Sequence, residues 1–391
     1  MKTKTEIVVI GGGVIGASVA YHLTARGARD VLILERENAP GRGSTGKATG
    51  GVRAQFETDI NIKMSLYSLG FFADFNEITG VDCGYEPRGY LFFATDERQF
   101  EYLKRNVEKQ KSLGVKEVEI VDASAIAKIV EGLNCEDIRG GAFGARDGFI
   151  NPLGVLEGFI GKALENGARL ETATEVFSIE TESGKVKAVE TSRGRIECEK
   201  IVLCSGAWAR ILAQTAGIDL PVTPQKRQIV WAKAARNFQE NLPMVIDLGS
   251  GFHFRPAKDS KNEILFAYPD RRDAEKPDFS IDFEESFIEK VYERAKHRAP
   301  FLYETEVVRE KCRAGLYENT PDHHAVLGGC REVEGLYFAN GFSGHGVMHS
   351  PATGRALAEI ILDGAATFLD VSCLRLERFK TGELLHETAF I

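Results

Sequence analysis

The stretch "EIVVIGGGVIGASVAYHLTARGARDVLILE", residues 6–35, decides the fold class of this chain. Residues 6–10 form a short apolar, β-branched run that ends in glycine, which predicts a buried strand. Residues 14–26 follow with helical spacing up to Gly27, a typical helix stop, and residues 31–35 predict a second strand. Strand, helix and parallel strand within about 30 residues are typical of a mononucleotide-binding unit.

The glycines of this unit have the spacing that binds a dinucleotide. Gly11 allows a tight turn, Gly13 lets a pyrophosphate approach the chain, and Gly16 lets the helix lie close to the sheet. Glu35 ends the second strand, where a carboxylate can accept the ribose hydroxyls; it also disfavours NADP. FAD and NAD share this pattern, and the unit alone does not separate them. The predicted contacts are Gly11, Gly13, Val14, Ile15, Gly16, Glu35 and Arg36.

Two later segments repeat the strand, glycine turn and helix: residues 200–217 and residues 335–364. Between these units, period-two alternation and charged helices predict a second, antiparallel-sheet domain built from two insertions. A chain of 391 residues is long enough for two such domains. We predict that the dinucleotide-binding domain comprises residues 1–85, 145–217 and 315–391, and the substrate (cap) domain residues 86–144 and 218–314.

The overall composition excludes several classes of protein. The net charge is −8 and there is no basic run, which argues against a nucleic-acid partner. The seven cysteines are scattered singly, so no zinc or dithiol motif is visible, as is usual in a reducing compartment. No apolar run is long enough for a transmembrane helix. We therefore expect a cytoplasmic protein.

The loop after the second strand, "GRGSTGKATGGVRAQF" at residues 41–56, favours a flavin over a nicotinamide. Its glycines and hydroxyl side chains can line a pyrophosphate and the edge of a flavin ring with hydrogen-bond donors. The alternative is a flexible surface loop.

Several segments, in chain order, carry a resemblance to a known family: the glycine turn, Glu35, "STGKATGGVR" (44–53), "CSGAWA" (204–209), "AGLYENTPDHHAVLG" (314–328) and "GFSGHGVMHSPATGRALAE" (341–359). They resemble the D-amino-acid oxidase superfamily of FAD-dependent oxidoreductases. Within it they are similar to the branch of sarcosine oxidase β-type subunits, proline dehydrogenases and dimethylglycine dehydrogenases. The resemblance implies FAD and an α/β fold, in which a Rossmann-like FAD-binding βαβ domain is interleaved with an antiparallel-sheet α+β substrate domain.

The resemblance also implies further cofactor contacts, and it gives the glycine turn at 341–346 a role. In this family such a turn directs backbone N–H groups and a helix dipole at the flavin edge, where negative charge accumulates on reduction. His345 and His349 have helical spacing, but no other ligand completes a metal set, so we predict no metal. The implied contacts are Ser44, Thr45, Lys47, Ala48, Gly50, Gly51, Val176, Ser205, Gly206, Trp208, Gly315, Gly341, Ser343, Gly344, His345, Gly346, Val347 and Met348.

The departures from the family pattern concern how flavin is attached and how it is reoxidised. Lys47 replaces a histidine, and Gly315 a cysteine, through which some relatives hold flavin covalently, so we predict non-covalent FAD. Met348 stands where some oxidases carry a lysine for the substrate carboxylate. The strand "EILFAY" (263–268) lacks the lysine with which those oxidases activate oxygen. We therefore expect a dehydrogenase.

On the substrate side, the resemblance places Arg53 and Arg255 near the cavity, where an arginine can bind a carboxylate through two hydrogen bonds. The alternative for either is a surface salt bridge. Tyr317 matches a position that faces the substrate, although a buried core tyrosine would have the same pattern. His253 is a further candidate catalytic residue.

The predicted function is the FAD-dependent oxidation of a small secondary or N-methylated amino acid, such as sarcosine or proline. Hydride transfer to flavin N5 would give an imine that hydrolyses, and the electrons would pass to an acceptor other than oxygen. The partner would be an electron-transfer subunit or a second copy of the chain. The alternatives are a true oxidase that makes hydrogen peroxide, and an FAD-bearing assembly or scaffold protein with little turnover.

Overall fold

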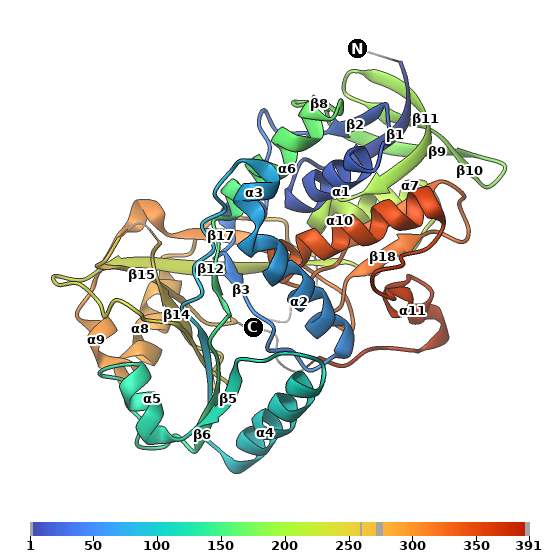
Figure 1. Ribbon diagram of the computed structural model, residues 1–391. Helices are drawn as coiled ribbons and strands as arrows, with labels where there is room; N and C mark the ends of the chain where they lie inside the picture. The colour runs from blue at the N-terminus through green and yellow to red at the C-terminus, as the bar shows by residue number, and fades with distance from the viewer. Residues whose placement is uncertain (1–2, 259, 271–276, 388–391) are drawn as a thin grey trace.

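The computed structural model describes residues 3–258, 260–270 and 277–387, in which two large sheets are found (Figure 1). β1 lies in the middle of the first sheet and pairs in parallel with β2 on one side and β11 on the other. The parallel pair of β1 and β2 is the βαβ unit predicted for residues 6–35. The strands follow each other in the order β18 (Val326–Gly329), β19 (Leu336–Asn340), β11 (Gly194–Leu203), β1 (Lys4–Ile10), β2 (Val31–Leu34) and β8 (Arg169–Glu171). A hairpin of β9 (Val176–Glu182) and β10 (Lys185–Thr191) extends from β11.

The side chains of β1 explain why both faces of this sheet are covered. Ile7 and Val9 belong to one hydrophobic cluster, whereas Val8 and Ile10 belong to a second. Successive side chains of a strand point to opposite faces, so an all-apolar strand needs a packing partner on each face.

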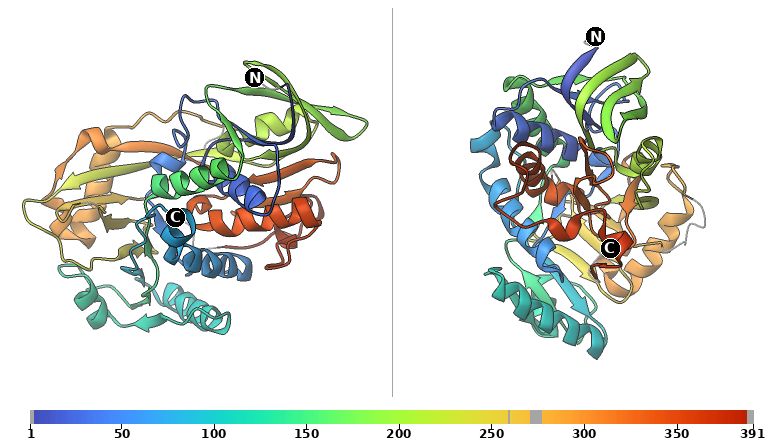
Figure 2. Two further views of the ribbon diagram at one scale, coloured as in Figure 1. Left: turned by 45° about the horizontal axis from the view of Figure 1, so that its top comes forward. Right: turned by 90° about the vertical axis from the view of Figure 1, so that its right-hand side faces the viewer.

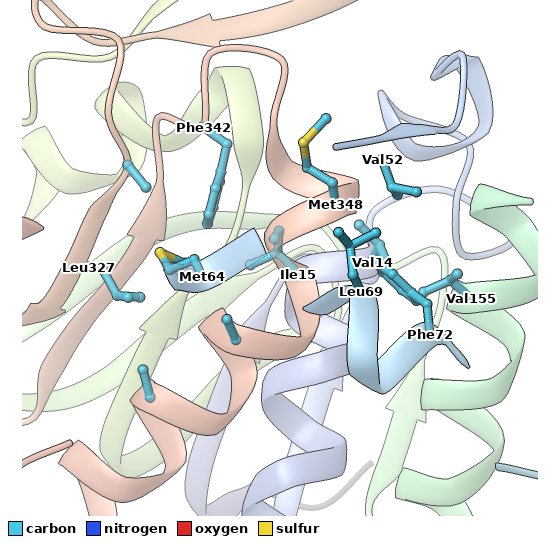
Figure 3. Close-up of a cluster of buried hydrophobic side chains, with 14 of the residues drawn as sticks. Val14, Ile15, Val52, Met64, Leu69, Phe72, Val155, Leu327, Phe342 and Met348 are labelled. Atoms are coloured by element: carbon cyan, nitrogen blue, oxygen red, sulfur yellow. The ribbon is translucent and has the colours of Figure 1, made fainter. Parts of the chain in front are cut away.

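Four helices cover the first of these faces: α1 (Val14–Ala25), α2 (Asp59–Ala73), α6 (Pro152–Glu165) and α10 (Gly346–Asp363). α1 packs against both α6 and α10, and α10 packs against α2. Figure 3 shows the result at the start of α1, where Val14 and Ile15 lie among Leu69 and Phe72 of α2 and Met348 of α10. The opposite face is covered in part by α7 (Ala209–Thr215), which contacts β9.

The second sheet is mostly antiparallel, as predicted, but one pair differs. β4 and β13 are parallel because they come from different insertions, so no hairpin constrains their direction. The order is β16 (Glu306–Val307), β12 (Thr223–Lys233), β15 (Glu263–Ala267), β14 (His253–Pro256), β13 (Met244–Asp247), β4 (Tyr90–Ala94), β6 (Gly140–Gly144) and β5 (Val118–Val121). β17 (Arg313–Asn319) also pairs with β12.

One of the predicted charged helices is α4, and its cap explains where it begins. The Asp96 side chain accepts a hydrogen bond from the Gln99 backbone N–H at 2.8 Å, while Leu103 and Val107 form the buried face. The helices of the second sheet are α4 (Glu97–Ser112), α5 (Ala123–Ile129), α8 (Ser286–Arg298) and α9 (Pro300–Tyr303). The short elements are α3 (Phe75–Thr79), α11 (Arg378–Thr381), β3 (Gly51–Val52), β7 (Gly148–Phe149) and the 3₁₀ turns η1 (Thr45–Lys47), η2 (Gly206–Trp208), η3 (Arg309–Lys311) and η4 (Ser372–Leu374).

The chain alternates between the two sheets, as the colours in Figures 1 and 2 show. Blue, green and red segments gather around the first sheet, and cyan, yellow and orange segments around the second. β17 lies mostly in a segment that we predicted for the dinucleotide-binding domain, yet it pairs with β12 along seven residue positions. The two predicted domains are therefore joined by a continuous strand pair. Within the described ranges, no helix is both long enough and apolar enough to cross a membrane.

Candidate active site

A cavity of about 450 Å³ lies between the two sheets. Ile10, Leu34 and Ala339 line it at the carboxyl ends of β1, β2 and β19, and Met244 and Ile246 line it from the second sheet. Open α/β sheets bind their ligands at the carboxyl ends of their strands. The second sheet therefore covers the position where a dinucleotide would bind.

Most of the predicted site residues line this cavity, and four do not. Those in the lining are Gly11, Gly13, Val14, Ile15, Glu35, Arg36, Ser44, Thr45, Lys47, Ala48, Gly50, Gly51, Arg53, Val176, Ser205, Gly206, Trp208, His253, Gly315, Tyr317, Gly344, His345, Gly346, Val347 and Met348. Gly16, Gly341, Ser343 and Arg255 lie outside it. Gly16 and Gly341 shape the turns, and the Ser343 hydroxyl donates to the Gly341 carbonyl at 3.3 Å.

The first glycine turn leaves space for a ligand at one position only. A Cβ on Gly11 would lie 2.4 Å from the Cys204 carbonyl oxygen, and a Cβ on Gly16 would lie 2.0 Å from that of Gly11. A Cβ on Gly13 would meet only the Thr45 hydroxyl, at 3.3 Å. Two of the glycines therefore serve close packing, and Gly13 borders open space, as a pyrophosphate site requires.

Glu35 is held in place by the backbone at the end of β2. Its Oε2 accepts a hydrogen bond from the Gly12 N–H at 2.8 Å, and its Oε1 accepts one from the Glu37 N–H at 2.9 Å. Both bonds fix the carboxylate beside the glycine turn, where it lines the cavity. This is the geometry expected of a ribose-binding carboxylate.

The two departures that concern flavin attachment lie side by side. A Cβ on Gly315 would lie 3.0 Å from the Cβ of Lys47, so the two positions are neighbours across the loop. The Lys47 ammonium donates to the Arg42 carbonyl at 2.8 Å, and burial lowers its pKa. The Ser44 hydroxyl donates to the Leu316 carbonyl at 2.7 Å, which ties this loop to β17.

The second glycine turn, between β19 and α10, makes room for Tyr317. Gly344 has a φ of +93°, and a Cβ there would lie 2.4 Å from the Tyr317 ring. The tyrosine therefore packs directly on the turn. Burial raises the pKa of Tyr317, so its hydroxyl keeps its proton and can donate.

Two neutral histidines lie at this turn and at the start of α10: His345 lines the cavity, and His349 lies outside the lining. Burial holds the pKa of His345 well below its usual range and lowers that of His349 to about 3. The His345 ring stands edge-on to Phe56 at 4.9 Å, and His349 Nε2 lies 3.0 Å from the Ser65 hydroxyl. The described residues contain no group of His, Cys, Asp and Glu that could hold a metal ion.

Arg53 brings a buried cation to the cavity. Its side chain is 3 % exposed, its guanidinium lies 3.8 Å above the Phe56 ring, and it donates to the Gln55 carbonyl. Burial lowers its pKa, while the Glu387 and Asp147 carboxylates favour its charged form. Asp147 also accepts hydrogen bonds from the Ala54 N–H and the Gln55 amide, at 2.7 and 3.0 Å.

Arg227 is a further cation in the lining, beside Arg36, Lys47 and Arg53, and sequence reasoning missed it. It lies on β12 opposite Gly315, and its guanidinium is 5.2 Å from the centre of the Tyr317 ring. Its charge helps to lower the pKa of His253. Arg227 stands just before the alternating run 228–234 that predicted the strand, so extending that run by one residue would have included it.

His253 offers the cavity a hydrogen-bond acceptor. Its Nδ1 lies 2.9 Å from the Gly251 carbonyl oxygen, which can only accept, so Nδ1 carries the hydrogen and Nε2 has the lone pair. Burial lowers the pKa of His253 to about 4. The ring is therefore neutral at physiological pH.

Arg255 lies two residues further along β14 but is turned away from the cavity. Its guanidinium donates to the Pro256 carbonyl at 2.8 Å and to the carbonyl of Thr49, a residue of the loop at 41–56. It lies 4.7 Å from the Phe149 ring. The guanidinium N–H groups that could bind a substrate carboxylate are thus bonded to nearby backbone carbonyls.

Unsatisfied polar atoms near the glycine turns indicate where a ligand would supply hydrogen bonds. Among the described residues, Ser205 Oγ and Glu318 Oε2 are buried without a partner, and both residues line the cavity. Buried polar groups are normally paired, so these two atoms fit a cavity whose ligand forms hydrogen bonds with them. With the Gly13 space and Glu35, the cavity fits FAD.

Comparisons with known proteins agree with this geometry. A family model described as "FAD dependent oxidoreductase" matches residues 6–360. FAD-dependent oxidoreductase domain-containing protein 1 of Xenopus laevis is 32 % identical, over 98 % of this chain and 84 % of that protein. The mitochondrial dimethylglycine dehydrogenase of Mus musculus is 27 % identical, over 94 % of this chain and 43 % of its own length. The crystal structure of L-proline dehydrogenase from P. horikoshii superposes with a TM-score of 0.89 and 30 % identity, over 98 % of this chain and 100 % of that one.

Proposed function

The chain belongs to the FAD dependent oxidoreductase family, and on that premise we propose that it oxidises a small secondary or N-methylated amino acid. The observation that carries this proposal is the composition of the cavity. Its lining combines the dinucleotide turn with Arg53, Arg227, Tyr317 and His253. Cations, a hydroxyl donor and a neutral acceptor suit a ligand that has both a carboxylate and an amine.

FAD would be held by the first glycine turn, Glu35 and the loop of residues 44–51. When bound, FAD supplies the acceptor for a hydride from the carbon next to the amine nitrogen. The N–H groups at the start of α10 and the positive end of its dipole favour negative charge in the adjoining cavity. We propose that the flavin is held without a covalent bond.

Arg227 is the proposed partner of the substrate carboxylate. It lies next to Tyr317, whose proton-bearing hydroxyl can donate a second hydrogen bond to the same carboxylate. Arg53 would add to the positive potential without needing direct contact. Arg255 has no part in this proposal because it lies outside the cavity lining.

His253 is the proposed partner of the substrate amine. Its Nε2 lone pair can accept a hydrogen from the amine and so orient the nitrogen, while Nδ1 stays bonded to the Gly251 carbonyl. Because the pKa of His253 is about 4, the ring does not add a positive charge beside a protonated amine at neutral pH. Met244 and Ile246 supply apolar walls that would exclude water from the reacting centre.

The proposed electron acceptor is a partner other than oxygen. β15, the strand on which related oxidases present a lysine, has Ile264, Leu265 and Phe266 at its centre, and all three are buried. Lys47 does line the cavity, but its ammonium is bonded to the Arg42 carbonyl within the same loop. A separate electron-transfer subunit would then receive the electrons.

The test is anaerobic reduction of the FAD-loaded protein by a panel of L-proline, sarcosine, glycine and a primary amine without a carboxylate. We expect flavin absorbance to bleach with proline or sarcosine and to persist with the amine. Reoxidation should be fast with an artificial dye and slow with oxygen. A flavin that stays oxidised with every compound would favour a scaffold protein instead, and rapid reoxidation by oxygen would favour an oxidase.

A further inference from the structure

Glu318 places a carboxyl group in the dinucleotide cavity, on the side away from the substrate residues. It lies on β17 directly after Tyr317 and belongs to the cavity lining. Its Oε2 lies 3.9 Å from the position that a Cβ on Gly206 would occupy. Gly206 follows Cys204 and Ser205, and the Cys204 carbonyl in turn lies against Gly11 of the first glycine turn. The carboxyl is therefore close to the segments that hold the dinucleotide.

The surroundings of Glu318 contain few groups that could compensate a negative charge. After the end of β11, Cys204 lies near it; burial, and then the Glu318 charge, raise the pKa of the Cys204 thiol, which stays uncharged. From the turn after β19, the Gly341 and Phe342 N–H groups partly stabilise the charged carboxylate. On β12, the residue opposite is Pro224. No cationic side chain of the described residues offsets the desolvation, and burial raises the pKa of Glu318 to about 7.

The hydrogen-bonding capacity of this carboxyl is left for a ligand. Oε2 is buried and has no partner among the described residues, and the neighbouring Ser205 hydroxyl is also unpaired. An ionised carboxylate in this position would repel the pyrophosphate of FAD and would lose further solvation when the cofactor covers it. A protonated carboxyl, in contrast, can donate a hydrogen bond to an oxygen of the cofactor.

We propose that Glu318 binds FAD as a neutral carboxylic acid that donates a hydrogen bond to it, so that cofactor binding takes up one proton from solvent. This inference rests on FAD binding alone and does not depend on the identity of the amino-acid substrate.

The sign of the pH dependence follows from linkage. The apoprotein carboxyl is half-protonated near pH 7, the value to which its pKa is raised, and bound FAD favours the protonated form further. FAD affinity is then full below pH 7 and falls as the pH rises, by about tenfold for each pH unit until the higher pKa of the complex is reached.

The experiment measures FAD binding to the apoprotein by flavin fluorescence between about pH 6 and about pH 9, and proton uptake by calorimetry in two buffers of different ionisation enthalpy. We expect uptake of about one proton at about pH 8 and a dissociation constant that rises with pH. Glu318→Gln, whose amide is neutral and still donates, should bind FAD with a weaker pH dependence and take up correspondingly fewer protons.

Glu35→Gln is the matched control, because it changes a carboxylate in the same cavity that is paired with two backbone N–H groups. It should weaken FAD binding at every pH and retain the wild-type pH dependence. The proposal is overturned if wild-type binding takes up no proton at about pH 8, or if Glu318→Gln retains the wild-type slope. If Glu318→Gln does not fold, the wild-type proton uptake alone decides. None of these measurements uses an amino-acid substrate, so their outcome is independent of the test of amino-acid oxidation.

Discussion

Two arginines of the second sheet, on β12 and β14, have different proposed roles because only one of them lines the cavity. Arg255 is bonded to two backbone carbonyls, whereas Arg227 lines the cavity beside Tyr317. Arg227 also donates to a backbone carbonyl, that of Lys226 at 3.4 Å, but Arg255 would have to turn into the cavity before it could bind a carboxylate there. We therefore expect the free energy of substrate binding to depend on Arg227 more than on Arg255.

The Arg227→Lys variant tests this assignment. We expect KM for the amino acid to rise about tenfold to a hundredfold, because a charge-assisted hydrogen bond contributes roughly 1.5–3 kcal/mol and lysine cannot replace the bidentate contact. Arg255→Lys is the matched control and should leave KM within about twofold of wild type. The assignment is wrong if Arg255→Lys has the larger effect on KM while both variants retain bound FAD.

Gly344→Ala tests the contact between the second glycine turn and Tyr317. Gly344 and Gly27 have nearly the same φ, +93° and +91°, but a Cβ on Gly27 meets nothing within 4 Å. Gly27→Ala therefore reports backbone strain alone, whereas Gly344→Ala adds a clash with the tyrosine ring. We expect the free energy of unfolding to fall by about 1–3 kcal/mol more in Gly344→Ala than in Gly27→Ala, measured by urea denaturation. Equal losses would show that the ring moves away without cost.

At the scale of elements, a small ribbon fixes the segment that carries Arg53. β3 and β7 pair as two short strands, and Asp147, directly before β7, accepts hydrogen bonds from the Ala54 N–H and the Gln55 amide. These bonds hold residues 54 and 55, which directly follow Arg53. The ribbon therefore positions the cation at the cavity, which Gly51 of β3 also lines.

The Asp147 carboxyl beside this ribbon should make the free energy of unfolding depend on pH. Burial raises the pKa of Asp147 to about 6, and the group is 2 % exposed. An acid whose pKa is raised on folding contributes stability below its unfolded pKa of about 3.9, and that contribution, about 2–3 kcal/mol, is lost as the pH rises to about 6. Asp147→Asn removes this term, so its free energy of unfolding should change less than that of the wild type between about pH 4 and about pH 7.

Urea denaturation at the two pH values measures this difference. Asp74→Asn changes an exposed aspartate and is the control, with the wild-type pH dependence expected. If Asp147→Asn and Asp74→Asn show the same pH dependence, the Asp147 carboxyl is ionised in the folded protein throughout this range.

For the whole molecule, the cavity exists only because the two sheets face each other across β17. Cys312, the cysteine nearest in sequence to the flavin-linking position of some relatives, lies against Trp231 outside the cavity, with the Trp231 N–H 3.4 Å from its sulfur. Cys204 does line the cavity, but burial raises the pKa of its thiol, which keeps it un-ionised and a poor nucleophile.

The FAD should therefore be released when the protein is denatured. We expect all flavin absorbance in the supernatant after acid precipitation of the holoprotein. Flavin that stays with the precipitate would contradict non-covalent binding, and mass spectrometry of the precipitate would then identify the linked residue.

The amino-acid sequence by itself determined the dinucleotide-binding unit and the second glycine turn. Gly11, Gly13 and Glu35 lie within one continuous βαβ stretch, so their relative positions follow from local geometry. The spacing of the strand–turn–helix segments likewise predicted the first sheet, although the parallel pairing of β4 with β13 and the place of β17 did not follow from it.

Only the tertiary structure decided which charged groups face the cavity. His253 and Arg255 are two residues apart on β14, a spacing that predicts side chains on the same face of the strand. Only His253 lines the cavity. Arg227 and Glu318 enter it through the register between β12 and β17, strands whose paired residues lie about 85–95 positions apart in the chain. The physical reason is that the direction of a long side chain depends on the partners that surround it. Those partners come from segments far apart in the sequence, and folding alone brings them together.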